Sequence, residues 1–107
     1  MNYKVIYHNG EMIDISTKVD SGSALLSDSA LEIVGSNPIS IPFSNMQTVE
    51  MFRLHGLGRM IKLVHTKGTL FLAVVRLNLF GYFAINNFFK TGQLNKHLKE
   101  KLTSDRL

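Results

Sequence analysis

Residues 49–76 read VEMFRLHGLGRMIKLVHTKGTLFLAVVR, and this stretch decides the fold. Its apolar and β-favouring residues fall into three short runs, at Val49–Leu54, Met60–His65 and Thr69–Arg76. Glycine-containing segments, His55–Gly58 and Lys67–Gly68, separate these runs. Short apolar runs divided by glycine turns are typical of antiparallel strands joined by hairpins. The stretch therefore predicts a three-stranded antiparallel unit.

Short apolar runs separated by turn residues recur over most of the chain, so further strands are predicted there. Further strands are expected at Lys4–Tyr7, Met12–Val19, Ser23–Leu26, Ala30–Val34, Ile39–Phe43 and Tyr82–Ile85. Pro42 cannot donate to a ladder, so its strand should lie at an edge or carry a bulge. Near the end, Leu94, Leu98 and Leu102 recur at helical spacing, with Thr91 as a plausible N-cap. We expect one mainly β domain over residues 1–107, with strands to about residue 86 and a helix over about 92–103.

Composition and motifs argue against catalysis. The chain has 107 residues, which suit one domain, and it has no cysteine, which excludes disulfides and thiolate chemistry. The four histidines lack metal-ligand spacing, and neither a nucleophile elbow nor a phosphate-binding loop is present. The sequence therefore predicts no enzyme activity, no metal and no cofactor.

The charges are distributed unevenly along the chain. Residues 1–50 hold two basic and six acidic residues, for a net charge of −4, whereas residues 51–107 hold ten basic and two acidic ones, for +8. Such asymmetry suggests a basic surface that faces an anionic partner. The alternative is that the two halves interleave in the fold and largely neutralise each other.

The cytoplasm is the expected compartment, because no secretory leader is apparent in the first residues. The stretch Leu70–Phe89 is about long enough to span a bilayer. Arg76 and Asn78 lie near its middle, however, and a central arginine is costly to insert. We therefore expect two buried strands there in place of a membrane-spanning helix.

The sequence also predicts the register of the three-stranded unit, that is, which residues of neighbouring strands lie opposite each other. Pairing the first two runs around Gly56 sets Val49 opposite Leu63, Met51 opposite Ile61, Arg53 opposite Arg59 and Glu50 opposite Lys62. This register joins apolar residues and opposite charges, so it is favoured over its one-residue slips. Pairing the second and third runs through Lys67–Gly68 sets Leu63 opposite Leu72, Ile61 opposite Val74 and Arg59 opposite Arg76.

The core-facing row of this sheet would then end in three aligned arginines, Arg53, Arg59 and Arg76. Like charges on neighbouring strands are unfavourable, so they need water, a carboxylate or a bound anion. Our hypothesis is a patch that contacts phosphate or carboxylate through these guanidinium groups. The alternative is solvated arginines whose methylene stems cover the rim of the core.

The opposite face of the three runs is apolar as well, at Phe52, Leu54, Met60, Val64, Phe71 and Val75. A sheet that is apolar on both faces is covered on both faces. Either the N-terminal strands or a second copy of the chain must pack there, so homodimerisation is also predicted. The phenylalanines from Phe71 to Phe89 are expected in the core and under the helix, which argues against nucleic-acid binding.

Two segments resemble a known family. Residues 22–33, GSALLSDSALEI, and residues 39–50, ISIPFSNMQTVE, are similar to the pleckstrin-homology-like (PH-like) domains of the GRAM and bacterial PH branches. The resemblance implies two near-orthogonal sheets closed by the C-terminal helix, and a binding role for lipids, peptides or proteins without catalysis. The basic pattern that PH domains use for phosphoinositides is missing, since only Lys18 lies near the first hairpin. No lipid-binding residue is therefore carried over.

Together these observations predict a non-catalytic binding module of PH/GRAM-like type. Its expected partner is anionic, either a lipid head group or an acidic protein segment, met through Arg53, Arg59 and Arg76. It would act in the cytoplasm or peripherally at the inner face of a membrane. The alternative is a self-associating structural or interaction protein with no small ligand.

Overall fold

The structure, a computed structural model, describes residues 2–14, 17–54, 58–77 and 84–105. In chain order these residues form β1 (Asn2–Asn9), β2 (Asp20–Leu26), β3 (Ala30–Gly35), β4 (Ile39–Pro42), the 3-10 turn η1 (Phe43–Asn45), β5 (Met46–Leu54), β6 (Gly58–His65), β7 (Gly68–Leu77), β8 (Ala84–Asn86) and α1 (Phe88–Asp105).

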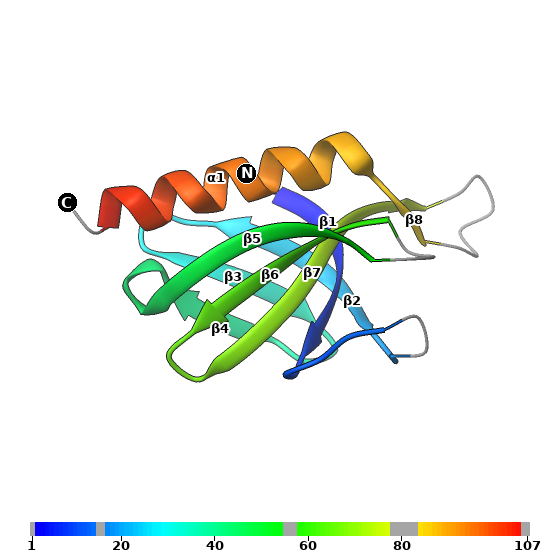
Figure 1. Cartoon of the computed structure of the whole chain (residues 1–107), viewed down its shortest axis with the longest axis horizontal. Helices are drawn as coiled ribbons and strands as arrows, with labels where there is room; N and C mark the ends of the chain where they lie inside the picture. The colour runs from blue at the N-terminus through cyan, green and yellow to red at the C-terminus, as the bar shows by residue number, and fades with distance from the viewer. Residues whose placement is uncertain (1, 15–16, 55–57, 78–83, 106–107) are drawn as a thin grey trace.

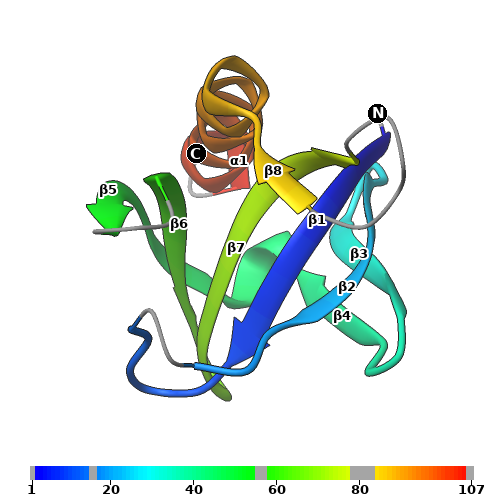
Figure 2. The ribbon, with the colours of Figure 1, turned by 90° about the vertical axis from the view of Figure 1, so that its right-hand side faces the viewer.

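The strands form one antiparallel sheet that curls into a half-barrel. Their spatial order is β4-β3-β2-β1-β7-β6-β5, and the short strand β8 pairs with β7. Two halves, β1–β4 and β5–β7, are continuous through the β1–β7 pairing, and α1 lies across the open side (Figures 1 and 2). The predicted fold class, mainly β with one C-terminal helix, is confirmed.

The core lies between the concave face of the sheet and α1. In β1 the side chains of Tyr3, Val5 and Tyr7 are buried and alternate with more exposed neighbours, as expected for a strand with one covered face. From the helix, Leu94 and Leu98 enter the same core and are fully buried. The leucine stripe that predicted the helix is thus the stripe that closes the half-barrel.

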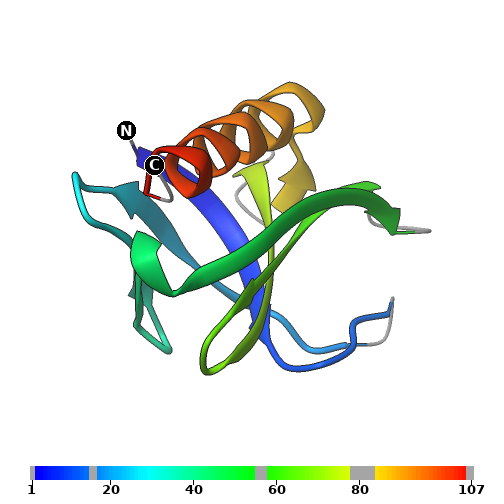
Figure 3. The ribbon, with the colours of Figure 1, turned by 60° about the vertical axis from the view of Figure 1, so that its left-hand side comes forward.

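The edges of the half-barrel are β4 and β5, as Pro42 predicted for its own strand. Figure 3 shows β5 running below α1 on the open side, and α1 contacts β5 as well as β6 and β7. Residues 78–83 of the stretch Leu70–Phe89 lie outside the described residues, and β7 and β8 flank them. No helix in the described ranges is both long enough and apolar enough to cross a membrane.

One predicted strand, Met12–Val19, is wrong for its described residues, 12–14 and 17–19. The Thr17 hydroxyl accepts a hydrogen bond from the Asp14 N–H (2.9 Å), and the Thr17 N–H donates to the Asp14 carbonyl (3.1 Å). Such local bonds give Asp and Thr an alternative to a strand ladder. The described residues of this segment therefore belong to a loop between β1 and β2.

The helix begins earlier than predicted, and Thr91 is not its N-cap. Asn87 takes that role, because its side-chain Oδ1 accepts a hydrogen bond from the Lys90 N–H (3.1 Å). Thr91 lies inside α1 and is fully buried. Its hydroxyl accepts from the Val74 N–H (3.0 Å) and donates to the Val74 carbonyl (3.3 Å), which ties the first turns of α1 to β7.

The β5–β6 register is confirmed at all four predicted pairs, including Arg53 opposite Arg59 and Glu50 opposite Lys62. The predicted β6–β7 register is wrong by two residues, since Ile61 lies opposite Leu72 and His65 opposite Gly68. Thr66 and Lys67 form the turn, and Gly68 follows it with φ 142°, a conformation that favours glycine. The glycine therefore occupies the first position of β7, and the two-residue turn lies one residue earlier in the chain than predicted.

Candidate anion-binding site

The candidate site forms where β6 and β7 part. Their pairing ends at Ile61 opposite Leu72. Two residues further along β7, the backbone of Val74 bonds to the Thr91 hydroxyl and to the Asn87 N–H (2.8 Å). The β8 side chain Asn86 donates to the carbonyl of Arg59 (2.7 Å). The start of the helix and β8 therefore occupy the backbone positions through which β6 would otherwise have paired with β7.

The position of β8 and the start of α1 between the ends of β6 and β7 determines where the Arg59 guanidinium lies. Its Cζ lies 3.4 Å from the centre of the Phe88 ring, in the first turn of α1, in a cation–π arrangement. A Cβ atom built on Gly92 would lie only 2.8 Å from Arg59 Nη1. The guanidinium therefore rests against the helix in a space that the missing side chain of Gly92 leaves open.

Two phenylalanines at this point face solvent, contrary to the expectation that they would be buried. Phe88 is 39% exposed and Phe89 is 83% exposed, and their rings pack edge to face with centres 5.4 Å apart. Phe71 is buried but lies outside the core beneath α1, whereas Phe80 and Phe83 lie outside the described residues. Exposed aromatic rings beside cationic groups are a feature of surfaces that bind partners.

We call the group Arg53, Arg59, Phe88, Phe89 and Lys90 the helix-start surface. Arg53 and Lys90 are exposed, and Arg59 is half-buried. Within the described part of the chain, the one contact of a basic side chain with a carboxylate is His97–Glu100 (3.8 Å), which is an ion pair only when His97 is protonated, so these cations have no carboxylate partner there. The first turn of α1 holds no acidic residue, and a helix N-terminus adds partial positive charge. The local field favours an anion.

Arg76 does not continue the arginine row that the sequence predicted. It lies opposite Ile85 of β8, and β8 separates its strand from the end of β6. Arg76 is exposed, so it adds positive charge to the same end of the sheet without aligning with Arg53 and Arg59. The structure thus brings two of the three predicted site residues together.

A second polar region lies at the turn end of β6 and β7. A cavity of about 370 Å³ is lined by Asn9, Pro38, Ile39, Ser40, Ile41, Pro42, Asn45, His65 and Lys67. The Nδ1 atom of His65 accepts from the Lys67 N–H (3.3 Å), while its buried Nε2 has no hydrogen-bond partner among the described residues. Burial, and then the charge of Lys67, lower the pKa of His65. The imidazole is therefore neutral at pH 7.

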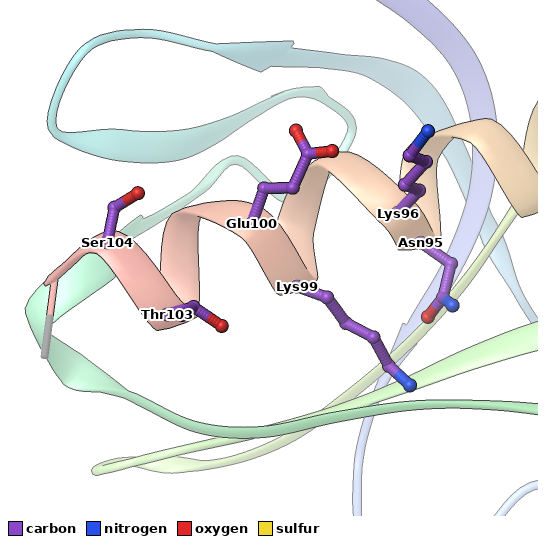
Figure 4. A pocket seen from close by; sticks show the side chains of 6 residues that line it. All are labelled: Asn95, Lys96, Lys99, Glu100, Thr103 and Ser104. Atoms are coloured by element: carbon purple, nitrogen blue, oxygen red, sulfur yellow. The ribbon is translucent and has the colours of Figure 1, made fainter.

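The flank of α1 carries a shallow depression that offers no comparable site. It is lined by Asn95, Lys96, Lys99, Glu100, Thr103 and Ser104. Figure 4 shows Asn95 and Lys99 pointing toward the green strands below the helix, while Lys96 and Glu100 point to the opposite side of the helix. All six belong to one helix, so their polar groups diverge where a binding site needs them to converge. Among the described residues, no group of three or more His, Asp or Glu could hold a metal ion.

Neither the known protein-family models nor the curated proteins include a match to this chain. Sequence reasoning found Arg53 and Arg59 through strand register but missed Phe88, Phe89 and Gly92. Gly92 stood at the first residue of the predicted helix and gave no signal there, whereas in the structure it lies inside α1, where a glycine often marks a close approach by another group.

Proposed function

We propose that this chain is a non-catalytic binding module of PH/GRAM-like type that contacts an anionic partner through its helix-start surface. The observation that carries the proposal is the placement of Arg53 and Arg59 opposite each other without a carboxylate partner among the described residues. Two guanidinium groups on neighbouring strands repel each other, and an anion bound between them would relieve that repulsion.

The architecture supports the resemblance from which the proposal starts. A PH-like domain is expected to have two sheet halves closed by a C-terminal helix, and a half-barrel of β1–β7 covered by α1 agrees with that layout. The site differs from the one that phosphoinositide-binding PH domains use, since it lies at the start of α1 and not around the first hairpin.

A lipid surface is the partner that this geometry favours. Phe89 is largely exposed, it precedes Lys90, and its ring packs against Phe88, which Arg59 covers. Exposed aromatic rings beside cations suit the head-group region of an anionic membrane. An acidic protein segment would satisfy the arginines but gives no role to the exposed ring. We accordingly place the protein in the cytoplasm, acting peripherally at the inner face of a membrane.

Cosedimentation with phosphatidylserine–phosphatidylcholine vesicles tests the proposal. The double variant Arg53→Gln/Arg59→Gln should bind roughly 20–30-fold more weakly than the wild type, because each basic residue near an anionic surface contributes about 1 kcal/mol. The matched control, Lys96→Gln/Lys99→Gln, removes the same charge from exposed positions on the flank of α1 and should bind almost normally.

Three further comparisons define the outcome. Binding should weaken with added salt, and it should be lost on vesicles of phosphatidylcholine alone. Equal losses in the two double variants would contradict the site, because they would show attraction by net charge alone. Binding to a polyglutamate peptide without binding to vesicles would replace the lipid by an acidic protein segment as the partner.

A further inference from the structure

The outer, convex face of the sheet carries a second feature, which the helix-start surface does not involve. A groove of about 390 Å³ lies there, lined by Met12, Ile13, Glu50, Met51, Phe52, Lys62 and Phe71. Phe52 and Phe71 meet edge to face with ring centres 6.0 Å apart. Phe71 is only 4% exposed, yet it does not belong to the core beneath α1. The convex face therefore has an apolar cluster of its own.

The side chain of Met12, at the edge of this groove, is exposed to solvent. Met12, in the β1–β2 loop, is 82% exposed although it also lines the groove. Hydrogen bonds between Asp14 and Thr17 hold the loop from within, since the Thr17 hydroxyl accepts from the Asp14 N–H and donates to the Asp14 carboxylate (3.3 Å). The loop is thus braced two residues beyond Met12.

The groove also carries one charge of each sign. Glu50 and Lys62 lie opposite each other on β5 and β6, so their Cβ atoms are neighbours. They nevertheless make no ion pair within the described part of the chain. Both charges are accordingly available to a second molecule at the rim of an apolar groove.

We infer that a second copy of this chain occupies the groove in an isologous dimer, with Met12 of each copy inserted into the groove of the other. A two-fold interface requires one face to be complementary to itself. This face meets that requirement because it holds a protruding methionine beside an apolar groove, and Glu50 of one copy can meet Lys62 of the other. The dimer goes beyond the proposed function, since it involves none of the residues of the helix-start surface.

Sedimentation equilibrium of the full chain over a range of concentrations provides the first test. Met12→Ala should weaken dimerisation at least about tenfold, since the variant forfeits the burial of one methionine side chain per copy. Met12 is exposed in the monomer, so the substitution should leave folding intact. Phe89→Ala is the matched control, because Phe89 is equally exposed on the helix-start surface, and it should leave the dimer unchanged.

A charge exchange gives a test that a folding defect cannot imitate. Glu50→Lys and Lys62→Glu should each be monomeric alone, because like charges would face each other across the interface. Mixed together they should form a heterodimer, because the first variant then carries only positive charges at positions 50 and 62 and the second only negative ones. In this heterodimer each of these side chains faces an opposite charge on the other copy. The two variants should therefore dimerise with each other in the absence of wild-type protein.

The results decide the inference in either direction. A concentration-dependent dimer that Met12→Ala weakens, Phe89→Ala spares and the mixed charge variants restore would support it. A wild-type chain that is monomeric at millimolar concentration would overturn it, as would equal weakening by Met12→Ala and Phe89→Ala. Vesicle binding by the helix-start surface does not enter these measurements, so this inference and the proposed function can fail separately.

Discussion

The two ends of the β6–β7 pair differ in what completes their backbone hydrogen bonding. At the turn end the strands close on each other, with His65 opposite Gly68 and the Thr66 N–H bonded to the Asn45 carbonyl (3.0 Å). At the other end they part, and side chains from β8 and α1 bond to Arg59 and Val74 in place of the opposite strand. The parted end is the one that holds the candidate site.

This difference shows how a binding surface can arise from a sheet without a dedicated loop. If β6 stayed paired with β7 as far as Arg59, the Arg59 guanidinium would lie beside β7. Because the helix start bonds to Val74 instead, Arg59 lies over Phe88 and against Gly92 at the surface. We therefore expect the hydrogen bonds of Thr91 to Val74 and of Asn86 to Arg59 to contribute to both stability and binding.

The largest effect should come from Thr91→Val, which keeps the shape of the side chain but removes its hydroxyl. The Val74 N–H would then be buried without a partner, whereas the Val74 carbonyl would keep the Asn87 N–H. We expect the free energy of unfolding in urea to fall by about 2–3 kcal/mol. Thr91→Ser is the control and should retain most of the stability, so an equal loss in both variants would contradict the role of the hydroxyl.

At the turn end, Gly68→Ala should be the next most costly change. The φ of 142° disfavours any residue with a Cβ, although no atom lies within 4 Å of the place that this Cβ would take. The cost is therefore conformational, and we expect a loss of about 1–2 kcal/mol. Lys67→Ala, at an exposed position of the same turn, should change the unfolding free energy little. A neutral Gly68→Ala would show that the hairpin can adopt another turn.

The two strand registers show where prediction from the sequence succeeds and where it fails. The β5–β6 register followed from Val49, Met51 and Glu50, because each has a complementary residue on the opposite strand and a slip would lose these pairs. The β6–β7 register offered no such charge pair, and a shift by two residues keeps every side chain on its face. Turn geometry at Gly68 decided that register, and sequence alone did not reveal it.

The candidate site was predictable in part for the same reason. Arg53 and Arg59 belong to the well-determined strand pair, so their juxtaposition followed from the sequence. The exposure of Phe88 and Phe89 did not, because it depends on how far the helix extends before Thr91. That start is set by Asn87 as N-cap and by the tertiary bond from Thr91 to Val74, and a local pattern does not contain the second of these.

A smaller effect is expected from Asn86→Leu, which removes the bond to the Arg59 carbonyl while keeping a side chain of similar size. The loss should be about 1 kcal/mol, because the carbonyl is only partly buried and water can replace the donor. Hydrogen exchange should locate the change, with faster exchange in β8 and the start of β6. Faster exchange at His65 and Gly68 as well would mean that the two ends are not independent.

The smallest effect should be a pH dependence at the turn end. Burial lowers the pKa of His65 below its ordinary value of 6.5, so the unfolded chain binds more protons than the folded one in this range. The contribution of His65 to stability is therefore present above pH 6.5 and is lost as the pH falls through the lowered pKa. His65→Gln should flatten this part of the profile of unfolding free energy against pH, and an unchanged slope would contradict the assignment.

The most direct test of the central claim is an amide NMR titration of the wild-type chain with phosphatidylserine-containing nanodiscs. We expect the signals of Arg53, Arg59 and Phe88–Lys90 to lose intensity first, while those of His65, Lys67 and Gly68 at the paired end persist. Attenuation confined to the turn end, or spread evenly over the lysines of α1, would contradict the claim that the parted end of β6 and β7 is the binding surface.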